Sequence, residues 1–592
     1  MIRAELSRGR ILVSTDAEGM KLAAALPGAT RSASMYIGTW QMPPVLESIV
    51  ALRNAHAKAS AELIAFAKQL LSAHKYVDAQ KNADVVTPLR DFPVKPGVKL
   101  YQHQIKMANI ALALFGYTSD GISNAVNPGG AVAILADMGT GKTAATVTVS
   151  GQLYADKRIE RVLIVAPSSV CAVWPGEYEH FAGFSFRIGM LLGDRAKRLA
   201  ALKRLTARSS IRTEQPLQVA IINYESVRLL EPELKAYAPD LIIADESQRI
   251  KNHSAKQSKA MHRIGDIAKY KMILTGTPIT QDTRDVWSQY RFLNADIFGS
   301  SYYAFMKHFA NMGGYGQHQY LGPRNLEELT RKAHSIAYRV TKADCLDLPE
   351  KIFEDRPVAL EPEARALYRQ IQKESFALLE AGAEGERSEI TAPIILTRLL
   401  RLQQLTGGFI TDDDGKVRHV STAKLDATED IARSLCVDEG KKLVIFARFK
   451  PEIEALRERI DSVLHPSGLK QVSISGEVPL TKRGALVEQF QTDPDTRVMI
   501  GQVDACAEGI TLHAASTTLY YSSSWNFAKY SQSQDRTHRI GQDKATLYIH
   551  LMVPGTIDTK IMSALKKKED LARSVVDNWR SLFAADDGGD DS

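Results

Sequence analysis

The chain has 592 residues, 44% of them hydrophobic and 24% charged, and its net charge is +7. This length exceeds one hydrophobic core and predicts roughly three or four domains, while the lack of a membrane-spanning apolar run or a signal-peptide core indicates a soluble intracellular protein. The four cysteines are widely spaced, with no CxxC and no neighbouring histidine pair, which argues against zinc sites and a disulfide framework.

Residues 1–95 are predicted to form a small α+β accessory domain. The stretches RILVSTD and SMYIGTWQMP have the pattern of short strands, and the stretch from Pro43 to Ala73 has the apolar spacing of one long helix. The proline-rich segment TPLRDFPVKPGVK then predicts a linker. The pattern around Trp40 fits either a packing core or a recognition module.

From Leu100 onward, short apolar runs alternate with helical patterns, as in AVAILA, RVLIVAP, LQVAIINY, DLIIAD and YKMILTG. Such alternation predicts βαβ units and a parallel sheet covered by helices on both faces. Residues 96–345 are therefore predicted to form a first lobe. This lobe includes the start of a helical insertion near residue 284.

Residues 346–424 continue the helical pattern and are predicted to be a helical insertion or linker. The strand–helix alternation resumes at Lys441, so residues 425–582 are predicted to form a second lobe of the same kind. Residues 583–592 are rich in Asp and Gly and are predicted to be a disordered acidic tail. The predicted fold is thus α/β, with two parallel-sheet lobes, helical insertions and a small N-terminal α+β domain.

A phosphate-binding loop is predicted where the strand AVAILA is followed by DMGTGKT and a helical pattern, with Ala136 in place of the usual first glycine. Glycines let the backbone curl so that its N–H groups point at phosphate oxygens, the lysine reaches the β- and γ-phosphates, and the threonine hydroxyl binds Mg²⁺. A bare glycine-rich turn is the alternative, but strand, loop and helix occur in the required order. The predicted ATP- and Mg²⁺-binding residues are Met138, Gly139, Thr140, Gly141, Lys142 and Thr143.

The apolar run LIIA ends in two adjacent acids, Asp245 and Glu246. By itself this pair fits solvated charge after a core strand. In P-loop enzymes, however, an aspartate at the end of a neighbouring strand holds Mg²⁺. Asp245 is therefore predicted to bind the metal together with Thr143, and Glu246 to orient the attacking water.

Two arginines near the end of the second lobe, Arg536 and Arg539, are predicted to stabilise charge at the γ-phosphate. Their spacing would place them on one face of a helix. An arginine supplied by a facing lobe acts only when the lobes close, which suits a motor. The alternative is a solvated basic helix end.

Together these segments resemble the motifs of superfamily-two helicase-like ATPases, and among them the Swi/Snf-type translocases of double-stranded DNA. The resemblance covers residues 98–570, and the ending RIGQ is specific for this branch. In chain order, the matching stretches are LYQHQ, ADMGTGKT, VAPSSVCAVWPGE, INYES, DESQRIKN, LTGTPI, VIFARF, DACAEGITLHAAS and QSQDRTHRIGQ. The resemblance implies two RecA-like lobes with ATP between them.

The resemblance also implies roles that the residues alone do not. Gln104 would read the adenine base. Closure of the lobes would bring Arg536 and Arg539 to the γ-phosphate, and each cycle would step the motor along duplex DNA without separating its strands. The DNA contacts implied by motif position are Ser168, Ser169, Tyr224, Arg448 and Trp525.

Several residues depart from the family pattern. Ser247 and Gln248 stand where the family has Ala and His, and Gln248 is expected to form a hydrogen bond across the lobe interface. Gln281 and Thr511 stand where Asn is usual, and Glu508 replaces a glycine. A carboxylate near a DNA phosphate would repel it, so the DNA contact of that motif is in doubt.

The expected function is that of an ATP-dependent translocase that remodels DNA or protein–DNA complexes in recombination, repair or the processing of forks and branched DNA. The protein is expected to be monomeric, to act in the cytoplasm of a bacterial or phage-infected cell, and to hold any protein partner through the N-terminal domain or the helical insertion. The N-terminal domain is similar to the small module that precedes the motor in annealing helicases. The alternatives are a strand-separating or RNA-directed helicase, and a DNA-binding adaptor with weak or partner-dependent ATPase activity.

Overall fold

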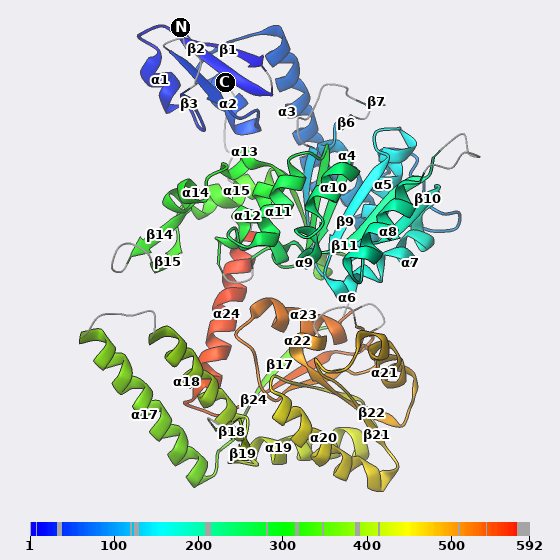
Figure 1. Cartoon of the computed structure of the whole chain (residues 1–592), viewed down its shortest axis with the longest axis vertical. Helices are drawn as coiled ribbons and strands as arrows, with labels where there is room; N and C mark the ends of the chain where they lie inside the picture. The colour runs from blue at the N-terminus through cyan, green and yellow to red at the C-terminus, as the bar shows by residue number, and fades with distance from the viewer. Residues whose placement is uncertain are drawn as a thin grey trace. The chain divides into compact units, whose positions relative to one another are not determined.

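The computed structural model describes residues 2–7, 9–31, 38–118, 121–122, 130–207, 215–279, 282–313, 319–345, 349–384, 391–412, 415–506, 510–539 and 542–576. The chain divides into two compact units. One contains the residues up to Cys345 and the C-terminal end of the last helix, and the other contains residues 346–570 (Figure 1). The predicted tail, residues 583–592, lies outside the described residues, as do Gln281 and Glu508.

The N-terminal domain is a five-stranded sheet in the order β3-β4-β2-β1-β5, packed against helices. Its core side chains include Ile11, Val13 and Trp40, so Trp40 is a packing residue of this domain. The prediction of a single long helix from Pro43 to Ala73 is wrong. The chain forms α2, then the short strand β5, then α3. The third element is a new helix because Ser60 caps it by accepting the Leu63 N–H. The elements are β1 (Ile2–Ser7), β2 (Arg10–Thr15), α1 (Met20–Ala25), β3 (Thr30–Arg31), β4 (Thr39–Met42), α2 (Leu46–Asn54), β5 (Lys58–Ala59) and α3 (Ala61–Asn82).

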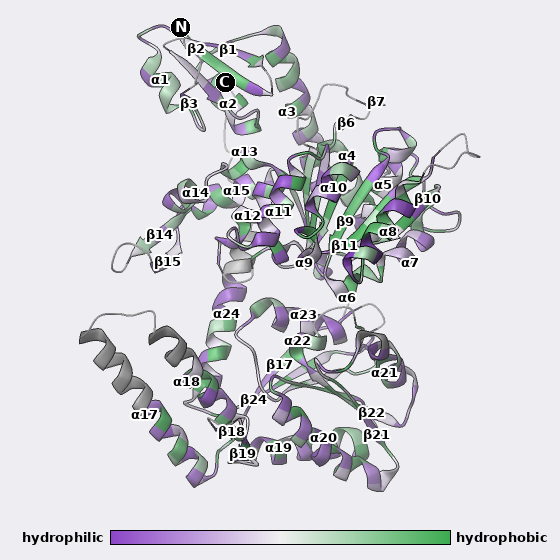
Figure 2. Cartoon of the chain, viewed as in Figure 1, coloured by the Kyte–Doolittle hydropathy of each residue, from purple (hydrophilic) through white to green (hydrophobic). Residues whose placement is uncertain are grey.

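The first lobe contains a seven-stranded parallel sheet in the order β10-β11-β9-β12-β13-β8-β16. Its central strands are mostly apolar, and in Figure 2 β9 and β11 appear largely green. This pattern fits a sheet buried on both faces. The strands are β8 (Gly130–Ala136), β9 (Arg161–Ala166), β10 (Phe186–Met190), β11 (Leu217–Asn223), β12 (Leu241–Asp245), β13 (Tyr270–Thr275) and β16 (Ala337–Val340).

Helices cover both faces of this sheet and form two separate apolar cores. The predicted linker does not hang free, because the Asn109 side chain accepts the Leu89 N–H at 2.7 Å and so ties the segment to the lobe. The helices are α4 (Gln102–Leu114), α5 (Lys142–Ala155), α6 (Ser168–Cys171), α7 (Trp174–Phe181), α8 (Arg195–Thr206), α9 (Tyr224–Val227), α10 (Glu231–Tyr237), α11 (Lys256–Gly265) and α16 (Lys342–Cys345), with a small hairpin of β6 (Tyr117–Thr118) and β7 (Gly121–Ile122) beside α4.

The insertion that begins near residue 284 is helical, as predicted, but it also contains a β-hairpin that the pattern did not reveal. Tyr320 of the hairpin lies under Arg284, with 4.5 Å from the guanidinium carbon to the ring centre. The elements are α12 (Asp285–Leu293), α13 (Ala295–Phe298), α14 (Tyr302–Phe309), β14 (Ala310–Gly313), β15 (Gln319–Pro323) and α15 (Leu326–His334).

The second unit contains a six-stranded parallel sheet in the order β17-β24-β23-β20-β22-β21. Its first strand, β17 (Lys351–Pro357), lies inside the segment predicted to be a helical insertion or linker. That prediction is wrong here because β17 is an edge strand with mostly exposed side chains, so it lacks the apolar run that identifies a buried strand. The other strands are β20 (Leu443–Ala447), β21 (Lys470–Ile474), β22 (Thr496–Gln502), β23 (Thr517–Tyr520) and β24 (Thr546–Met552).

The helices of the second unit include the predicted helical pair of the insertion, α17 and α18. A short hairpin of β18 (Phe409–Thr411) and β19 (Val417–His419) follows that pair. The helices are α17 (Pro362–Glu384), α18 (Thr391–Thr406), α19 (Ala423–Ala432), α20 (Lys450–Leu464), α21 (Leu480–Thr492), α22 (Val503–Cys506), α23 (Phe527–Thr537) and α24 (Ile557–Val576). Among all described residues, no helix is long and apolar enough to cross a membrane.

Candidate active site

The predicted phosphate loop joins the end of β8 to the start of α5. Gly139 and Gly141 have φ angles of +84° and +78°, a region that glycine enters without steric cost. Lys142 Nζ donates to the carbonyl oxygens of Ala136 at 2.7 Å and Asp137 at 3.2 Å, so the lysine lies folded over the loop. Strand, left-handed glycines and helix N-terminus together form a cradle of the kind that binds phosphate.

The start of α4 packs directly against this loop. Gln104 accepts the Tyr101 N–H at 3.0 Å, and its amide nitrogen lies so close to Gly141 that a Cβ there would meet it at 2.0 Å. His103 Nε2 lies 2.8 Å from the Thr140 carbonyl oxygen. The structure thus brings Gln104 to the loop, and adds His103, whose role the sequence did not indicate.

The acid pair lies at the end of β12, in the middle of the sheet. Asp245 and Glu246 are only 7% and 6% exposed, so they are not solvated loop charges. Trp174 Nε1 donates to Asp245 Oδ2 at 3.1 Å and so fixes the carboxylate. Burial, and then the neighbouring Glu246 charge, raise the pKa of Asp245, while Lys142 opposes the shift.

Glu246 has a φ of +54°, an unusual backbone conformation for a non-glycine residue and one that is often found at functional sites. Gln248 Nε2 donates to Glu246 Oε2 at 2.7 Å, and Thr275 Oγ1 at the end of β13 donates to Gln248 Oε1 at 2.8 Å. Both partners of Gln248 belong to the first unit, and the expected bond across the lobes stays a prediction. Ser247, the other departure from the family pattern, donates to Gln289 at 2.6 Å.

The residues at or just after the carboxyl ends of β8 and β12 suit a magnesium ion. Thr143 offers a hydroxyl in the first turn of α5, and Asp245 offers a buried carboxylate; oxygen ligands of this kind are those that Mg²⁺ prefers. A divalent cation would also offset the repulsion between the adjacent carboxylates, which adds to the effect of burial in raising the pKa of Asp245. Thr143 and Asp245 therefore fit the predicted metal site.

The two arginines of the second unit both contact the segment after α22. Arg536 is buried and donates to the Ile510 carbonyl at 3.1 Å, and Arg539 donates to Thr511 Oγ1 at 2.7 Å. They do not share a helical face, however, because α23 ends at Thr537. His538 breaks the helix, and Arg539 follows it in irregular structure. Burial lowers the pKa of Arg539, against the opposing charge of Asp535.

The residues predicted to contact DNA in the first lobe differ in their exposure to solvent. Ser168 and Ser169 begin α6 after β9, where Ser168 is exposed. Tyr224 is fully buried, and its hydroxyl donates to the Asp245 carbonyl oxygen at 2.7 Å. The prediction that Tyr224 touches DNA is therefore wrong: this side chain supports the end of β12.

In the second unit, Arg448 follows β20 and is half-buried, with its guanidinium donating to Gln403 of α18. Trp525 is half-exposed in the segment before α23, and its carbonyl accepts the Lys568 Nζ at 2.9 Å. Both side chains retain surface that DNA could reach. Glu452, which the sequence did not single out, accepts the N–H groups of Arg448 and Phe449 at 3.1 and 3.0 Å.

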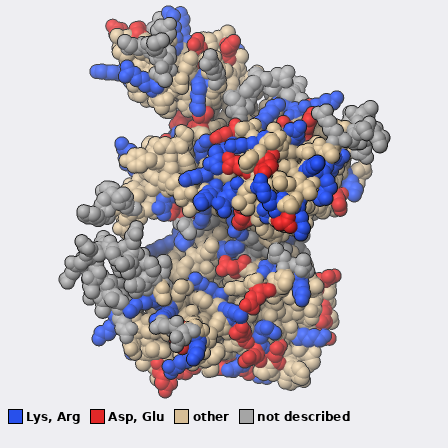
Figure 3. Space-filling view, viewed as in Figure 1, with Lys and Arg blue, Asp and Glu red and all other residues tan. Residues whose placement is uncertain are grey.

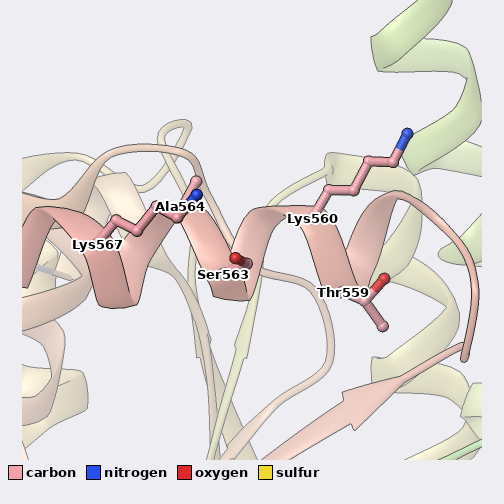
Figure 4. Close-up of a pocket in the computed structure, with 5 residues that line it drawn as sticks. All are labelled: Thr559, Lys560, Ser563, Ala564 and Lys567. Carbon is pink, nitrogen blue, oxygen red and sulfur yellow. The ribbon is translucent and has the colours of Figure 1, made fainter.

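Two surface features lie apart from these residues. Figure 3 shows Lys and Arg gathered over α8 and α11 of the first unit with acids among them, and pairs such as Arg263–Glu231 neutralise part of this charge. A hollow of about 290 Å³ lies on α24 and is lined by Thr559, Lys560, Ser563, Ala564 and Lys567. Figure 4 shows all five of these residues on successive turns of that one helix.

Comparison with known proteins gives consistent matches. The family model for the SNF2-related domain matches residues 98–407, and that for the helicase conserved C-terminal domain matches residues 423–541. The DNA annealing helicase and endonuclease ZRANB3 of Bos taurus is 27% identical over 80% of this chain and 42% of its own length. A Caenorhabditis elegans homolog of the SWI/SNF-related matrix-associated actin-dependent regulator of chromatin subfamily A-like protein 1 is 24% identical over 78% of this chain and 62% of its own.

Among solved structures, the Sulfolobus solfataricus SWI2/SNF2 ATPase core in complex with double-stranded DNA is 25% identical and covers 85% of this chain and 98% of its own, with a TM-score of 0.38. The chain spans about two fifths of the length of ZRANB3, so what the whole of that protein does is not carried over by the match.

Proposed function

Since the chain belongs to the SNF2-related domain family, we propose that it is an ATP-hydrolysing motor that moves along duplex DNA. The observation that carries this proposal is that functional residues lie together at or just after the carboxyl ends of three adjacent strands. The loop after β8, the acid pair after β12 and the Thr275–Gln248–Glu246 hydrogen-bond chain from β13 meet at one edge of the first sheet. In parallel α/β sheets, ligands bind at this edge.

Each residue has a defined part in hydrolysis. Gln104 contacts the adenine, Lys142 leaves its two carbonyl partners for the β- and γ-phosphates, and Thr143 and Asp245 hold Mg²⁺. Glu246, held by Gln248, orients the attacking water. Bound Mg²⁺ supplies charge neutralisation at the phosphates.

The second unit completes the reaction only when the two lobes close. Arg536 and Arg539 then stabilise the charge that develops on the γ-phosphate, and hydrolysis lets the lobes reopen. Their resting contacts with Ile510 and Thr511 tie them to the segment that follows β22 and α22, so a DNA contact there could bias their position.

DNA is gripped mainly by its phosphates, through Ser168, Ser169, Arg448 and Trp525, so binding is expected to be independent of sequence and sensitive to salt. The relative ZRANB3 is named as a DNA annealing helicase, which supports forked or branched DNA as the substrate here. We further propose that the protein is monomeric, acts in the cytoplasm of a bacterial or phage-infected cell, and uses its N-terminal domain or α17–α18 for a protein partner.

A Glu246→Gln variant tests the motor against a DNA-binding adaptor whose ATPase is weak or partner-dependent. The change keeps size and hydrogen bonding but removes the charge that orients water, so DNA-stimulated turnover should fall about 10³-fold while nucleotide affinity is retained. Steady-state hydrolysis and binding of a fluorescent ATP analogue measure the two effects. Turnover that is unchanged by the substitution would favour the adaptor.

A further inference from the structure

Asp137, the first residue of the phosphate loop, is held by an arginine about two hundred residues away. Arg339 lies on the edge strand β16, and its NH1 donates to Asp137 Oδ1 at 2.7 Å. The other carboxylate oxygen accepts the Lys342 N–H at 3.0 Å, and the Asp137 N–H donates to the Val340 carbonyl at 3.0 Å. Every one of these three bonds joins the loop to residues 339–342.

This clamp fixes the part of the loop on which the catalytic lysine rests. Lys142 Nζ donates to the carbonyl oxygens of Ala136 and Asp137, and the Ala136 carbonyl belongs to the same peptide as the Asp137 N–H that the clamp holds. The later part of the loop has its own support, because His103 lies 2.8 Å from the Thr140 carbonyl. Loss of the clamp should therefore misplace Lys142 more than it weakens the phosphate cradle.

The position of Arg339 also argues against a simple core ion pair. Strand β16 pairs only with β8, so the side-chain contact adds to a single row of backbone bonds. The Arg339 side chain is 10% exposed and that of Asp137 is 27% exposed, so the pair is partly shielded from water. Three residues after Lys342 the first unit ends, which places the clamp beside the chain segment that leads to the second lobe.

We propose that Arg339 is a positioning residue for the phosphate loop: through Asp137 it fixes the start of the loop from which Lys142 reaches the phosphates. The inference rests on the proposed ATP hydrolysis. It does not depend on which DNA structure stimulates the enzyme.

The test compares Arg339→Gln, Asp137→Asn and the double variant in the full chain. Asp137→Asn retains an acceptor for the Lys342 N–H. Each single variant should lower kcat for ATP about tenfold, because a charge-assisted hydrogen bond is lost, while the Kd of a fluorescent ADP analogue changes less than about twofold. Since both variants break one contact, the double variant should resemble either single variant, and Arg339→Lys should recover part of kcat.

A matched control is Arg291→Gln, which removes an ion pair of the same unit that lies elsewhere, between Arg291 and Asp266 at 2.8 Å. Arg291→Gln should leave kcat unchanged even if it lowers the melting temperature as much as Arg339→Gln does. A kcat of Arg339→Gln equal to the wild type, an additive loss in the double variant, or an equal loss in Arg291→Gln would each overturn the inference. If DNA did not stimulate ATP hydrolysis by the wild type, the proposed motor would be contradicted. The role of Arg339 would then be tested by kcat measured without DNA.

Discussion

The two lobes both contain a parallel sheet, but they differ at the N-terminus of the helix that follows one of its strands. In the first lobe, Gly141 is the N-cap residue of α5, and its lack of a side chain leaves the helix N-terminus without a side-chain cap. In the second lobe, α20 is capped by its own carboxylate, because Glu452 accepts the N–H groups of Arg448 and Phe449 and the Ser522 hydroxyl at 2.6 Å. One helix start is therefore available to a phosphate, and the other is already occupied by a carboxyl group of the chain.

This difference explains why ATP is expected to bind to the first lobe although either topology could accommodate it. A helix N-terminus attracts negative charge through its unpaired N–H groups and its dipole. The second lobe satisfies that preference internally, and its strand ends instead hold Arg448 and the segment with Arg536 and Arg539. Substitutions at each helix start test this difference.

Among substitutions that test this contrast, the largest effect is expected from Gly141→Ala. The new Cβ would meet Gln104 Nε2 at 2.0 Å in a backbone conformation that L residues rarely adopt. We expect kcat/KM for ATP to fall about a hundredfold and the preference for ATP over GTP to shrink, because Gln104 is displaced. Steady-state kinetics with both nucleotides measure this.

Gly139→Ala is the matched control for that substitution. It has a similar φ of +84°, but nothing lies within 4 Å of its Cβ. It should cost only the backbone strain, about tenfold, with the ATP preference intact. Equal losses in both variants would show that the Gln104 contact is unimportant.

A smaller effect, on stability, is expected at the second helix start. Burial raises the pKa of Glu452 from 4.5 to about 7. Because the folded protein then binds the proton more tightly than the unfolded chain, the stabilising contribution is fully present below pH 4.5 and is lost as the pH rises to about 7. Glu452→Gln should remove this slope, a difference of roughly 3 kcal/mol across the window.

Thermal unfolding of the wild type and of Glu452→Gln between pH 5 and pH 8 would measure that difference. The wild type should lose stability relative to the variant over this range. If the two curves remained parallel, Glu452 would not titrate within the folded protein, and the internal cap would be a permanent anion.

The smallest effect is expected from Tyr224→Phe in the first lobe. The substitution removes the hydrogen bond to the Asp245 carbonyl and should cost about 1 kcal/mol of stability. Because Tyr224 is buried, the Kd for duplex DNA should stay within about twofold of the wild type. A fluorescence-anisotropy titration that showed a large loss of DNA affinity, with the fold intact, would restore the DNA-contact role.

The comparison also shows what the sequence could predict. The phosphate loop and the acid pair are contiguous stretches whose residue order carries the geometry, and the structure brings both to one sheet edge. The clamp between Arg339 and Asp137 could not be predicted, because it depends on which strand lies beside β8. Edge strand β17 was missed because its side chains are mostly exposed, and Arg539 was misplaced because the end of α23 at Thr537 leaves no clear pattern in the sequence.

The central claim is that this chain is a DNA-driven ATPase, and steady-state ATP hydrolysis tests it most directly. Rates should be measured without nucleic acid and with single-stranded DNA, blunt duplex, forked duplex and RNA, at low and moderate salt, for the wild type and for Lys142→Ala. The proposal predicts strong stimulation by duplex DNA, weaker at higher salt and absent in Lys142→Ala. Equal wild-type rates in every condition would contradict it.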